Sequence, residues 1–389
     1  MSAHLRAARR HGDPLSLARP VTIVWLLAML LLQACSEPAP MRIGFIGGIS
    51  GRGADLGISG RNGAQLAVEQ WNARGGLNGR PIELQTRDDG GDTEHAKRVF
   101  RELSANGCHA VVGPMTSAIA LAIAPLADEL GLTLVSPTVT TNALSGKDDQ
   151  FFRVVAPTRE FTEQSAIHLG EHLGLSHLAV IYDATNAAYA ASWLADFRRR
   201  FEADGRAIVA VLTFESGAQE RLQPLARKLL SEPIDGVLIL ANSLDAALLA
   251  QQVRHLDADI QLAASEWAAT SRLTEMGGRA VEGMAIASFL DEDSQAPGYL
   301  AFREAYRKRF GGEPGFGGLT GFDAANVVLN GLARKRPDES LRDYLRREPE
   351  VPAAQGAFAF DASGDGQRST FITTIRDGRF ERVRNDNGH

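Results

Sequence analysis

Three loop segments of this sequence carry hydroxyl, backbone amide and carboxyl groups suited to binding a small charged molecule. The segment Gly113–Ser117 joins an apolar run to a helical pattern, so Ser117 lies at a predicted helix N-terminus, which suits a carboxylate. The segment Ser136–Thr141, with Thr138 and Thr140, follows the next predicted strand. Glu266 follows another and can pair with an ammonium group. Open α/β sheets bind ligands at the carboxyl ends of their strands, so the three segments together predict a ligand site.

Each of these residues also has a purely structural interpretation. Ser117 can simply cap its helix, Thr140 can be a turn residue, and Glu266 can be a solvated acid. Taken singly, the structural interpretation is favoured for each residue. Only as a set do they favour a binding site.

Motifs for cofactors and catalysis are missing from the sequence. The loop Gly47–Gly53 has its glycines in the order G-x-x-G-x-G, and Asp88 and Asp89 follow it by about 40 residues, whereas a dinucleotide site has G-x-G-x-x-G and an acid about 20 residues on. The sequence contains no Gly-Lys-Ser/Thr, H-E-x-x-H, C-x-x-C or G-x-S-x-G pattern, and its nine histidines are scattered. We therefore expect no enzyme, no cofactor and no metal site.

The first 35 residues have the pattern of an export signal. Residues 1–20 hold four arginines and one acid, and the next twelve residues contain a single polar side chain. This apolar run is shorter than the roughly 20 residues that span a bilayer, so a transmembrane helix is the weaker interpretation. The segment ends Leu32-Gln33-Ala34-Cys35, which resembles a bacterial lipobox. We expect a lipoprotein signal peptide over 1–35, lipidation at Cys35 and a tether over 36–40; an ordinary signal peptide with a chance cysteine is the alternative.

Composition and charge exclude several classes of protein. The chain has 389 residues, of which 44% are hydrophobic and 23% charged, which is typical of globular proteins and, at about 150 residues per domain, of two domains. The formal charge of −6 becomes −9 when the four arginines and one aspartate of residues 1–35 are removed. No basic run with interleaved aromatics occurs, so nucleic-acid binding is disfavoured. Cys108 would have no partner for a disulfide, and we expect it to be a buried, unreactive thiol.

From Met41 onward, short apolar runs alternate with longer stretches of helical period. The first series contains a predicted strand at Met41–Ile46, a helix over Gly63–Ala73 and a strand at Thr133–Ser136. The pattern restarts after Phe151–Val155 and ends in two β-like runs. Such alternation is typical of βαβ units. The sequence predicts an α/β fold of two lobes, each built on a doubly wound parallel sheet.

Much of the mature chain resembles the periplasmic binding proteins of the leucine/isoleucine/valine type. The segments concerned are Gly63–Ala67, Trp71–Arg80, Asp88–Asp89, Val111–Ser117, Ser136–Thr140 and Phe152–Val154, with weaker matches at Leu178–Asp183, Glu266 and Glu282–Gly283. The resemblance implies the type I periplasmic binding protein fold, in which two lobes joined by three crossovers close over a ligand. On this chain the crossovers are expected near residues 158, 289 and 368. Lobe 1 would then comprise 41–158 and 290–368, and lobe 2 would comprise 159–289 and 369–389.

The resemblance also implies roles for individual residues. In amino-acid binders of this family, the ligand carboxylate is held at positions that correspond to Ser117, Thr138 and Thr140, and the ligand ammonium at the position of Glu266. Thr158, at the first crossover, is a further candidate.

Three positions depart from the family pattern. Where well-known members have aromatic residues, this sequence has Leu56, Ala187 (with Tyr189 displaced by two) and Asn242. We therefore expect a remodelled side-chain pocket that has lost aromatic residues.

The function that the resemblance implies is binding of a small solute for an ABC importer. The expected ligand is an amino acid, with a branched-chain or other apolar one as the leading candidate, and the expected partners are the permease subunits and a membrane reached through the lipid anchor. We expect a monomer in the periplasm or cell envelope. The alternatives are binding of an amide or urea-like solute, or a lipid-anchored sensor or activator that uses the same fold to bind an envelope protein.

Overall fold

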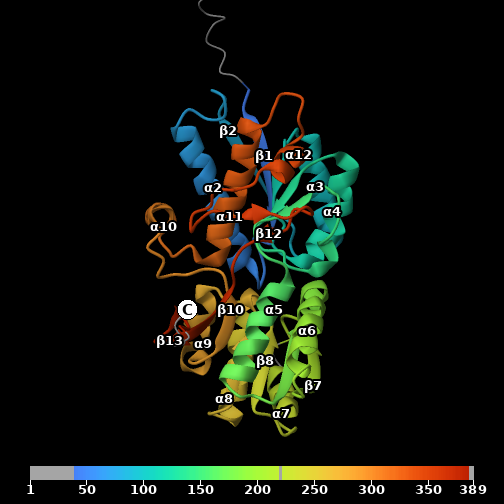
Figure 1. The fold of residues 1–389 in the computed structure, drawn as a ribbon, viewed down its shortest axis with the longest axis vertical. Coiled ribbons are helices and arrows are strands. Elements are labelled where there is room, and N and C mark those ends of the chain that lie inside the picture. The colour runs from blue at the N-terminus through green and yellow to red at the C-terminus, as the bar shows by residue number, and fades with distance from the viewer. Residues whose placement is uncertain (1–38, 219–220, 385–389) are drawn as a thin grey trace, which may run out of the picture. The chain divides into compact units, whose positions relative to one another are not determined.

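Lobe 1 is built on a five-stranded sheet whose strands all run parallel, in the order β2-β1-β3-β4-β5 (Figure 1). It is seen here in a computed structural model, which describes residues 39–218 and 221–384. The predicted signal peptide, Cys35 and the start of the predicted tether lie outside these residues. The strands are β1 (Met41–Gly47), β2 (Ile82–Asp88), β3 (Val111–Val112), β4 (Leu134–Ser136) and β5 (Phe151–Arg153).

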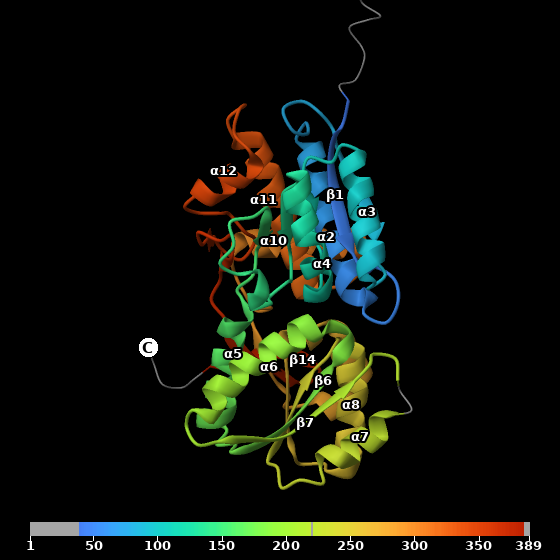
Figure 2. The ribbon, with the colours of Figure 1, turned by 90° about the vertical axis from the view of Figure 1, so that its right-hand side faces the viewer.

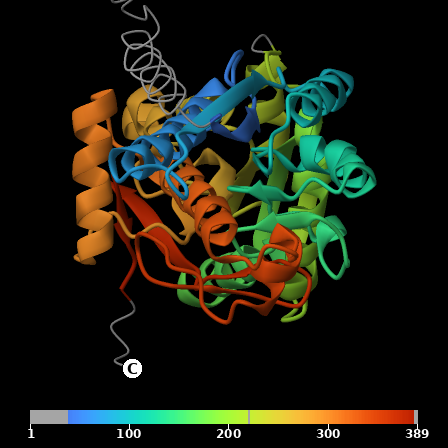
Figure 3. The same ribbon diagram turned by 90° about the horizontal axis from the view of Figure 1, so that it is seen from above.

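Helices cover both faces of this sheet. Helices α3 and α4 pack together on one face, and α2 and α11 lie side by side on the other (Figure 3). The helices of lobe 1 are α2 (Ala54–Ala73), α3 (Thr93–Ala105), α4 (Ser117–Leu130), α10 (Pro297–Phe310), α11 (Gly315–Arg334) and α12 (Leu341–Arg347). The short strands β11 (Ala359–Phe360) and β12 (Gly366–Gln367) pair with each other, and a 3-10 turn, η1 (Asn142–Leu144), follows β4.

Helix α2 begins at Ala54, well before the predicted start at Gly63. Glycines are poor helix formers and hide the helical pattern of this first half. They are accommodated because α2 packs closely against α11. A Cβ on Gly63 would lie 2.0 Å from the carbonyl oxygen of Gly318, and one on Gly321 would lie 2.2 Å from the carbonyl oxygen of Gly60. Packing between helices that are distant in sequence therefore outweighs the local propensity.

Cys108 is buried in the apolar cluster around α3 and α4, as predicted. Burial raises the pKa of its thiol to about 11, so the thiol stays protonated at neutral pH. Cys108 is therefore a packing residue.

Lobe 2 contains a seven-stranded sheet in the order β14-β13-β10-β9-β8-β6-β7. The predicted parallel arrangement is found from β7 to β10, but β13 is antiparallel to both of its neighbours, so the sheet is mixed. A tight turn joins β13 to β14, and such a turn can only connect antiparallel strands. The strands are β6 (His177–Asp183), β7 (Ala207–Phe214), β8 (Gly236–Leu240), β9 (Gln261–Ala264), β10 (Ala285–Ser288), β13 (Phe371–Arg376) and β14 (Arg379–Arg382).

The helices of lobe 2 flank this sheet (Figure 2). They are α5 (Thr158–Ile167), continued by a π turn η2 (His168–His172), then α6 (Ala187–Glu202), α7 (Leu222–Leu229), α8 (Ser243–Leu256) and α9 (Ser271–Gly277). Shorter turns are η3 (Ala184–Asn186), η5 (Glu266–Ala268) and η6 (Gly278–Val281). Among the described residues, no helix combines the length and apolar character that crossing a bilayer requires.

The chain passes between the lobes three times. The passages run from β5 to α5, from β10 to α10, and from β12 to β13. In Figure 2 these segments lie together at one side, where α5 enters lobe 2. The opposite side of the boundary is formed by the ends of strands and helices.

Arg153, the last residue of β5, fastens three parts of lobe 1 together. Its side chain is fully buried. Nε donates to Asp365 Oδ1 at 2.7 Å, Nη1 donates to the carbonyl oxygen of Thr141 at 2.9 Å, and Nη2 donates to Ser145 Oγ at 2.5 Å. The guanidinium thereby holds the 137–141 loop against the segment that leads to the third passage.

Replacing Arg153 by Met is expected to lower the free energy of unfolding by about 3–5 kcal/mol, because Asp365 would remain buried without its cation. Urea unfolding measures this. The matched control is Arg42→Met, which removes an exposed pair with Glu83 and should cost at most about 1 kcal/mol. Equal losses in the two variants would show that the buried pair is dispensable.

Candidate functional site

The two lobes meet around a pair of neighbouring cavities. The inner cavity has a volume of about 20 Å³, and the outer cavity has a volume of about 340 Å³. Leu56, Met115, Thr116, Asn186 and Trp267 line both, so the two cavities adjoin. The inner one has room for about one water molecule, whereas the outer one falls in the range of small-molecule sites.

The predicted residues Ser117 and Thr138 form the lobe 1 side of the inner cavity. Ser117 is the first residue of α4, and its Oγ accepts from the backbone N–H of Thr141 at 3.4 Å. Thr138 Oγ1 donates to the carbonyl oxygen of Met115 at 2.6 Å. These bonds tie the 137–141 loop to the turn before α4. The arrangement places hydroxyl groups beside the positive end of a helix, which is an environment suited to a carboxylate.

Glu266 faces this group from lobe 2. It begins η5 directly after β9, and only 6% of the residue is exposed. Its Oε2 accepts from Trp193 Nε1 at 3.0 Å, and its Oε1 accepts from Thr140 Oγ1 at 3.4 Å across the lobe boundary. Burial raises the pKa of Glu266 to about 7, although these hydrogen bonds act against the rise. No lysine or arginine among the described residues bonds to this carboxyl group, so its charge is balanced only by neutral donors.

Three aromatic side chains that the sequence prediction did not include also line the inner cavity: Tyr189, Trp267 and Phe316. The rings of Tyr189 and Trp267 meet edge to face with centroids 5.5 Å apart. The three positions named in the sequence analysis lack aromatic side chains, but aromatic residues from other positions line the inner cavity. Tyr189 lies in the first turn of α6 and still reaches the cavity, Trp267 directly follows Glu266, and Phe316 comes from α11.

The remaining predicted residues lie at different places. Leu56 is buried in α2 and lines both cavities. Asn242 lines the outer cavity, and its Oδ1 accepts from Asp245 N–H at the start of α8. Thr158 lines neither cavity. It is fully buried at the start of α5, where its Oγ1 donates to Asp196 Oδ2 at 3.1 Å.

Polar contacts join the lobes beside the cavities. Asp55 of α2 accepts hydrogen bonds from Ser243 Oγ at 2.7 Å and from Thr270 Oγ1 at 2.6 Å, both in lobe 2. Arg52 Nη2 lies 2.6 Å from Asp245 Oδ1. The lobes are thus in direct contact around the candidate site.

The chain is similar to a known family of proteins over most of its length. A family model described as periplasmic binding protein matches residues 40–379. The chain belongs to this family. This confirms the predicted family and the prediction of a binding protein rather than an enzyme.

Curated relatives of this periplasmic binding protein are distant but cover most of its length. It is 24% identical over 358 residues to the Leu/Ile/Val-binding protein BraC3 of Rhizobium johnstonii, spanning 90% of this chain and 96% of the relative. It is 22% identical over 344 residues to the Leu/Ile/Val-binding protein of Escherichia coli K12, spanning 87% and 92%.

A solved structure confirms the fold. The branched-chain amino acid transporter substrate binding protein LivJ of Streptococcus pneumoniae, in complex with isoleucine, superimposes with a TM-score of 0.82. It has 24% sequence identity and covers 88% of this chain and 99% of its own. The predicted two-lobed α/β architecture is therefore right.

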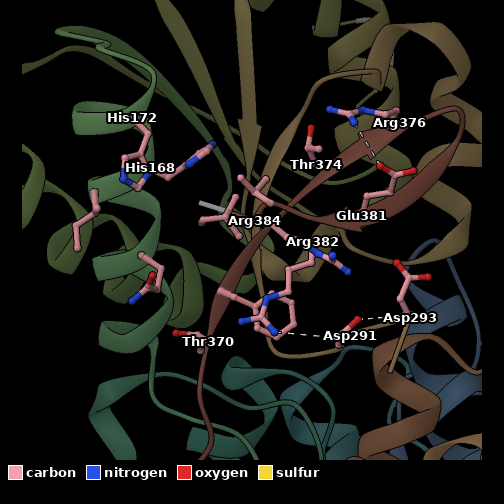
Figure 4. A pocket seen from close by; sticks show the side chains of 15 residues that line it. His168, His172, Asp291, Asp293, Thr370, Thr374, Arg376, Glu381, Arg382 and Arg384 are labelled. Carbon is pink, nitrogen blue, oxygen red and sulfur yellow. Dashed lines mark hydrogen bonds and ion pairs between the residues drawn. The ribbon is translucent and has the colours of Figure 1, made fainter. Parts of the chain in front are cut away.

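This periplasmic binding protein also has a larger cavity, of about 990 Å³, within lobe 2 (Figure 4). It lies between α5 with its π turn and the β13–β14 hairpin, and includes His168 and His172. Burial and then the neighbouring His172 lower the pKa of His168. Arg382 pairs with Asp291 at its rim. Asp291 and Asp293, from the segment that leads to α10, also line it, whereas the predicted residues Ser117, Thr138 and Glu266 do not.

Replacing Glu266 by Gln is expected to change how the stability of this binding protein depends on pH. The folded state raises the pKa of Glu266 from 4.5 to about 7, so it binds this proton more tightly than the unfolded chain does. The free energy of unfolding therefore falls as pH rises from about 4.5 to 7. The variant lacks this loss and should exceed the parent by about 3 kcal/mol at pH 8, with the difference vanishing near pH 4.

Urea unfolding of both proteins at pH 4, 6 and 8, after refolding to remove bound solute, measures the difference. The other titrating groups are common to both proteins, so their contributions to the free energy of unfolding cancel in the difference. A difference that does not vary with pH would contradict the buried, ligand-free state of this carboxyl group.

Proposed function

We propose that this chain is the extracytoplasmic solute-binding component of an ABC importer and that it holds an α-amino acid between its lobes. The observation that supports this most is Glu266, a buried acid without a cationic partner among the described residues, facing the hydroxyl groups of lobe 1. A ligand with an ammonium group and a carboxylate on adjacent atoms matches both sides.

The proposed contacts divide the ligand between the lobes. Ser117, Thr138 and Thr140 would receive the α-carboxylate at the N-terminus of α4, and Glu266 would receive the α-ammonium. A charge-assisted hydrogen bond to a buried acid is stronger than the neutral ones it has now. Relatives named as Leu/Ile/Val-binding proteins, and the isoleucine complex of LivJ, support an amino acid as the ligand.

Admission of the ligand requires the lobes to move. The inner cavity has room for about one water, and Thr140, which does not line it, contacts Glu266 across the lobe boundary. We propose domains at the boundaries predicted from the sequence, with the three passages near residues 158, 289 and 368 acting as the hinge. Closure would then restore the contacts of Asp55 and Arg52 and present a surface to the permease.

The decisive experiment is calorimetric titration of the purified, refolded protein with a panel of L-amino acids, amides and urea. We expect an α-amino acid to bind, and Glu266→Gln to weaken that binding by about 2–5 kcal/mol, because the buried ammonium loses its charged partner. Asp128→Asn, an exposed acid at the end of α4, is the control and should bind as the parent does.

Equal affinities of the parent and Glu266→Gln would refute the assignment of Glu266. Failure of every amino acid to bind would refute the amino-acid importer and would leave the amide or urea binder and the partner-binding sensor as the remaining functions.

We propose in addition that Cys35 is lipidated and anchors the protein to a membrane of the cell envelope. Cells that express the chain and grow with radiolabelled palmitate should yield a labelled protein in the membrane fraction. Cys35→Ala should abolish both the label and the sedimentation, whereas Cys108→Ala, which alters a buried thiol, should leave them unchanged. A label that survives Cys35→Ala would exclude this anchor.

A further inference from the structure

The outer cavity provides more space than the proposed contacts to the α-carboxylate and the α-ammonium require. It has a volume of about 340 Å³ and adjoins the inner cavity through Leu56, Met115 and Trp267. If the proposed function holds, an amino acid fixed at Glu266 and Ser117 has its side chain directed into this space. The walls of the outer cavity therefore select the side chain.

Asp89 is the most informative of the residues that line the outer cavity. It lies in the turn after β2 and is only 2% exposed, although it lines the cavity. Its Oδ1 accepts from the backbone N–H of Gly91 at 2.8 Å, and no lysine or arginine of the described residues bonds to it. Burial raises the pKa of Asp89 to about 6, and the adjacent Asp88 adds to the rise. The backbone N–H of Gly91 and the nearby His95 act against the rise, but no lysine or arginine of the described residues compensates this carboxyl group.

The charges around the cavity do not balance within the chain. Asp183, fully buried, is a second carboxylate in its lining, and it accepts only from neutral donors of Thr185 and Ser216. Arg52 is the cationic residue of the lining, but its guanidinium lies against the buried Asp245 behind the wall. The lining thus holds two carboxylates, those of Asp89 and Asp183, and one guanidinium, that of Arg52. Asp245 already neutralises this guanidinium.

We propose that the outer cavity binds the cationic end, an ammonium or a guanidinium, of the side chain of a basic α-amino acid. The apolar stem of that side chain passes Leu56, Met115 and Trp267, and its cation lies at Asp89. Such side chains combine an aliphatic stem with a charged head, and the two parts match the two kinds of wall.

Other side chains fit these walls less well. A branched aliphatic side chain would leave Asp89 buried against methyl groups, and a buried charge without a partner is costly. A carboxamide would donate a hydrogen bond to Asp89 but would not compensate its charge. Only an ammonium or guanidinium group both donates a hydrogen bond to Asp89 and compensates its charge.

The test compares the affinities of the purified full chain for L-lysine, L-arginine, L-glutamine and L-leucine by calorimetry. We expect lysine or arginine to bind at least tenfold more tightly than leucine and glutamine. In Asp89→Asn, which keeps an acceptor for Gly91 N–H, the ratio of the lysine affinity to the leucine affinity should fall at least tenfold. Asp128→Asn should leave the ratio unchanged.

The outcomes separate this inference from the proposed function. If leucine or glutamine binds most tightly and Glu266→Gln abolishes that binding, the amino-acid clamp stands and the cationic subsite is refuted. A ratio that Asp89→Asn does not alter also refutes it. If no amino acid binds the parent protein, both proposals fail.

Discussion

The buried pair of Arg153 and Asp365 is the interaction on which the rest of the site depends. A guanidinium removed from water is tolerated only where acceptors surround it, and here the 137–141 loop and Ser145 provide them. That requirement fixes the direction of the loop backbone and hence the position of Thr140. The first passage between the lobes starts directly after Arg153. This residue therefore holds both the 137–141 loop and the beginning of that passage in place.

On the lobe 2 side of the candidate site, the main constraint is the free-energy cost of burying the carboxyl group of Glu266. Neutral donors from Trp193 and Thr140 reduce this cost, but the raised pKa shows that they do not remove it. Closing the lobes completes the desolvation of the carboxylate. Under the proposed function, an ammonium bound between the lobes would compensate this charge only when both sides are in place, so that ligand binding and closure would stabilise each other.

Much of this fold follows from local pattern, and much of the site does not. Alternating apolar runs predicted the strands, because a buried parallel strand is apolar along its whole length. The early start of α2 was missed, because the close approach of its Gly60 to Gly321 of α11, more than 200 residues away, cannot be read from local pattern. Ser117, Thr138 and Glu266, which the family resemblance singled out, line one cavity, and their roles in binding stay predictions. Tyr189 and Asp89 were not predicted as part of the site, since neither an aromatic residue in a helix nor an acid after a strand reveals by itself that it lines a cavity.

The polar contacts between the lobes differ in how far their partners are exposed to water. The Arg52 side chain keeps 31% of its exposure while paired with Asp245, and Asp55 accepts from hydroxyl groups that water can also satisfy. Asp245 is buried, however, so opening the lobes would have to hydrate a carboxylate that the partly exposed arginine now compensates. Under the proposed function, a ligand that bridges Glu266 and the 137–141 loop would contact both lobes only in the closed form, and its differential affinity would set the equilibrium between the open and closed forms.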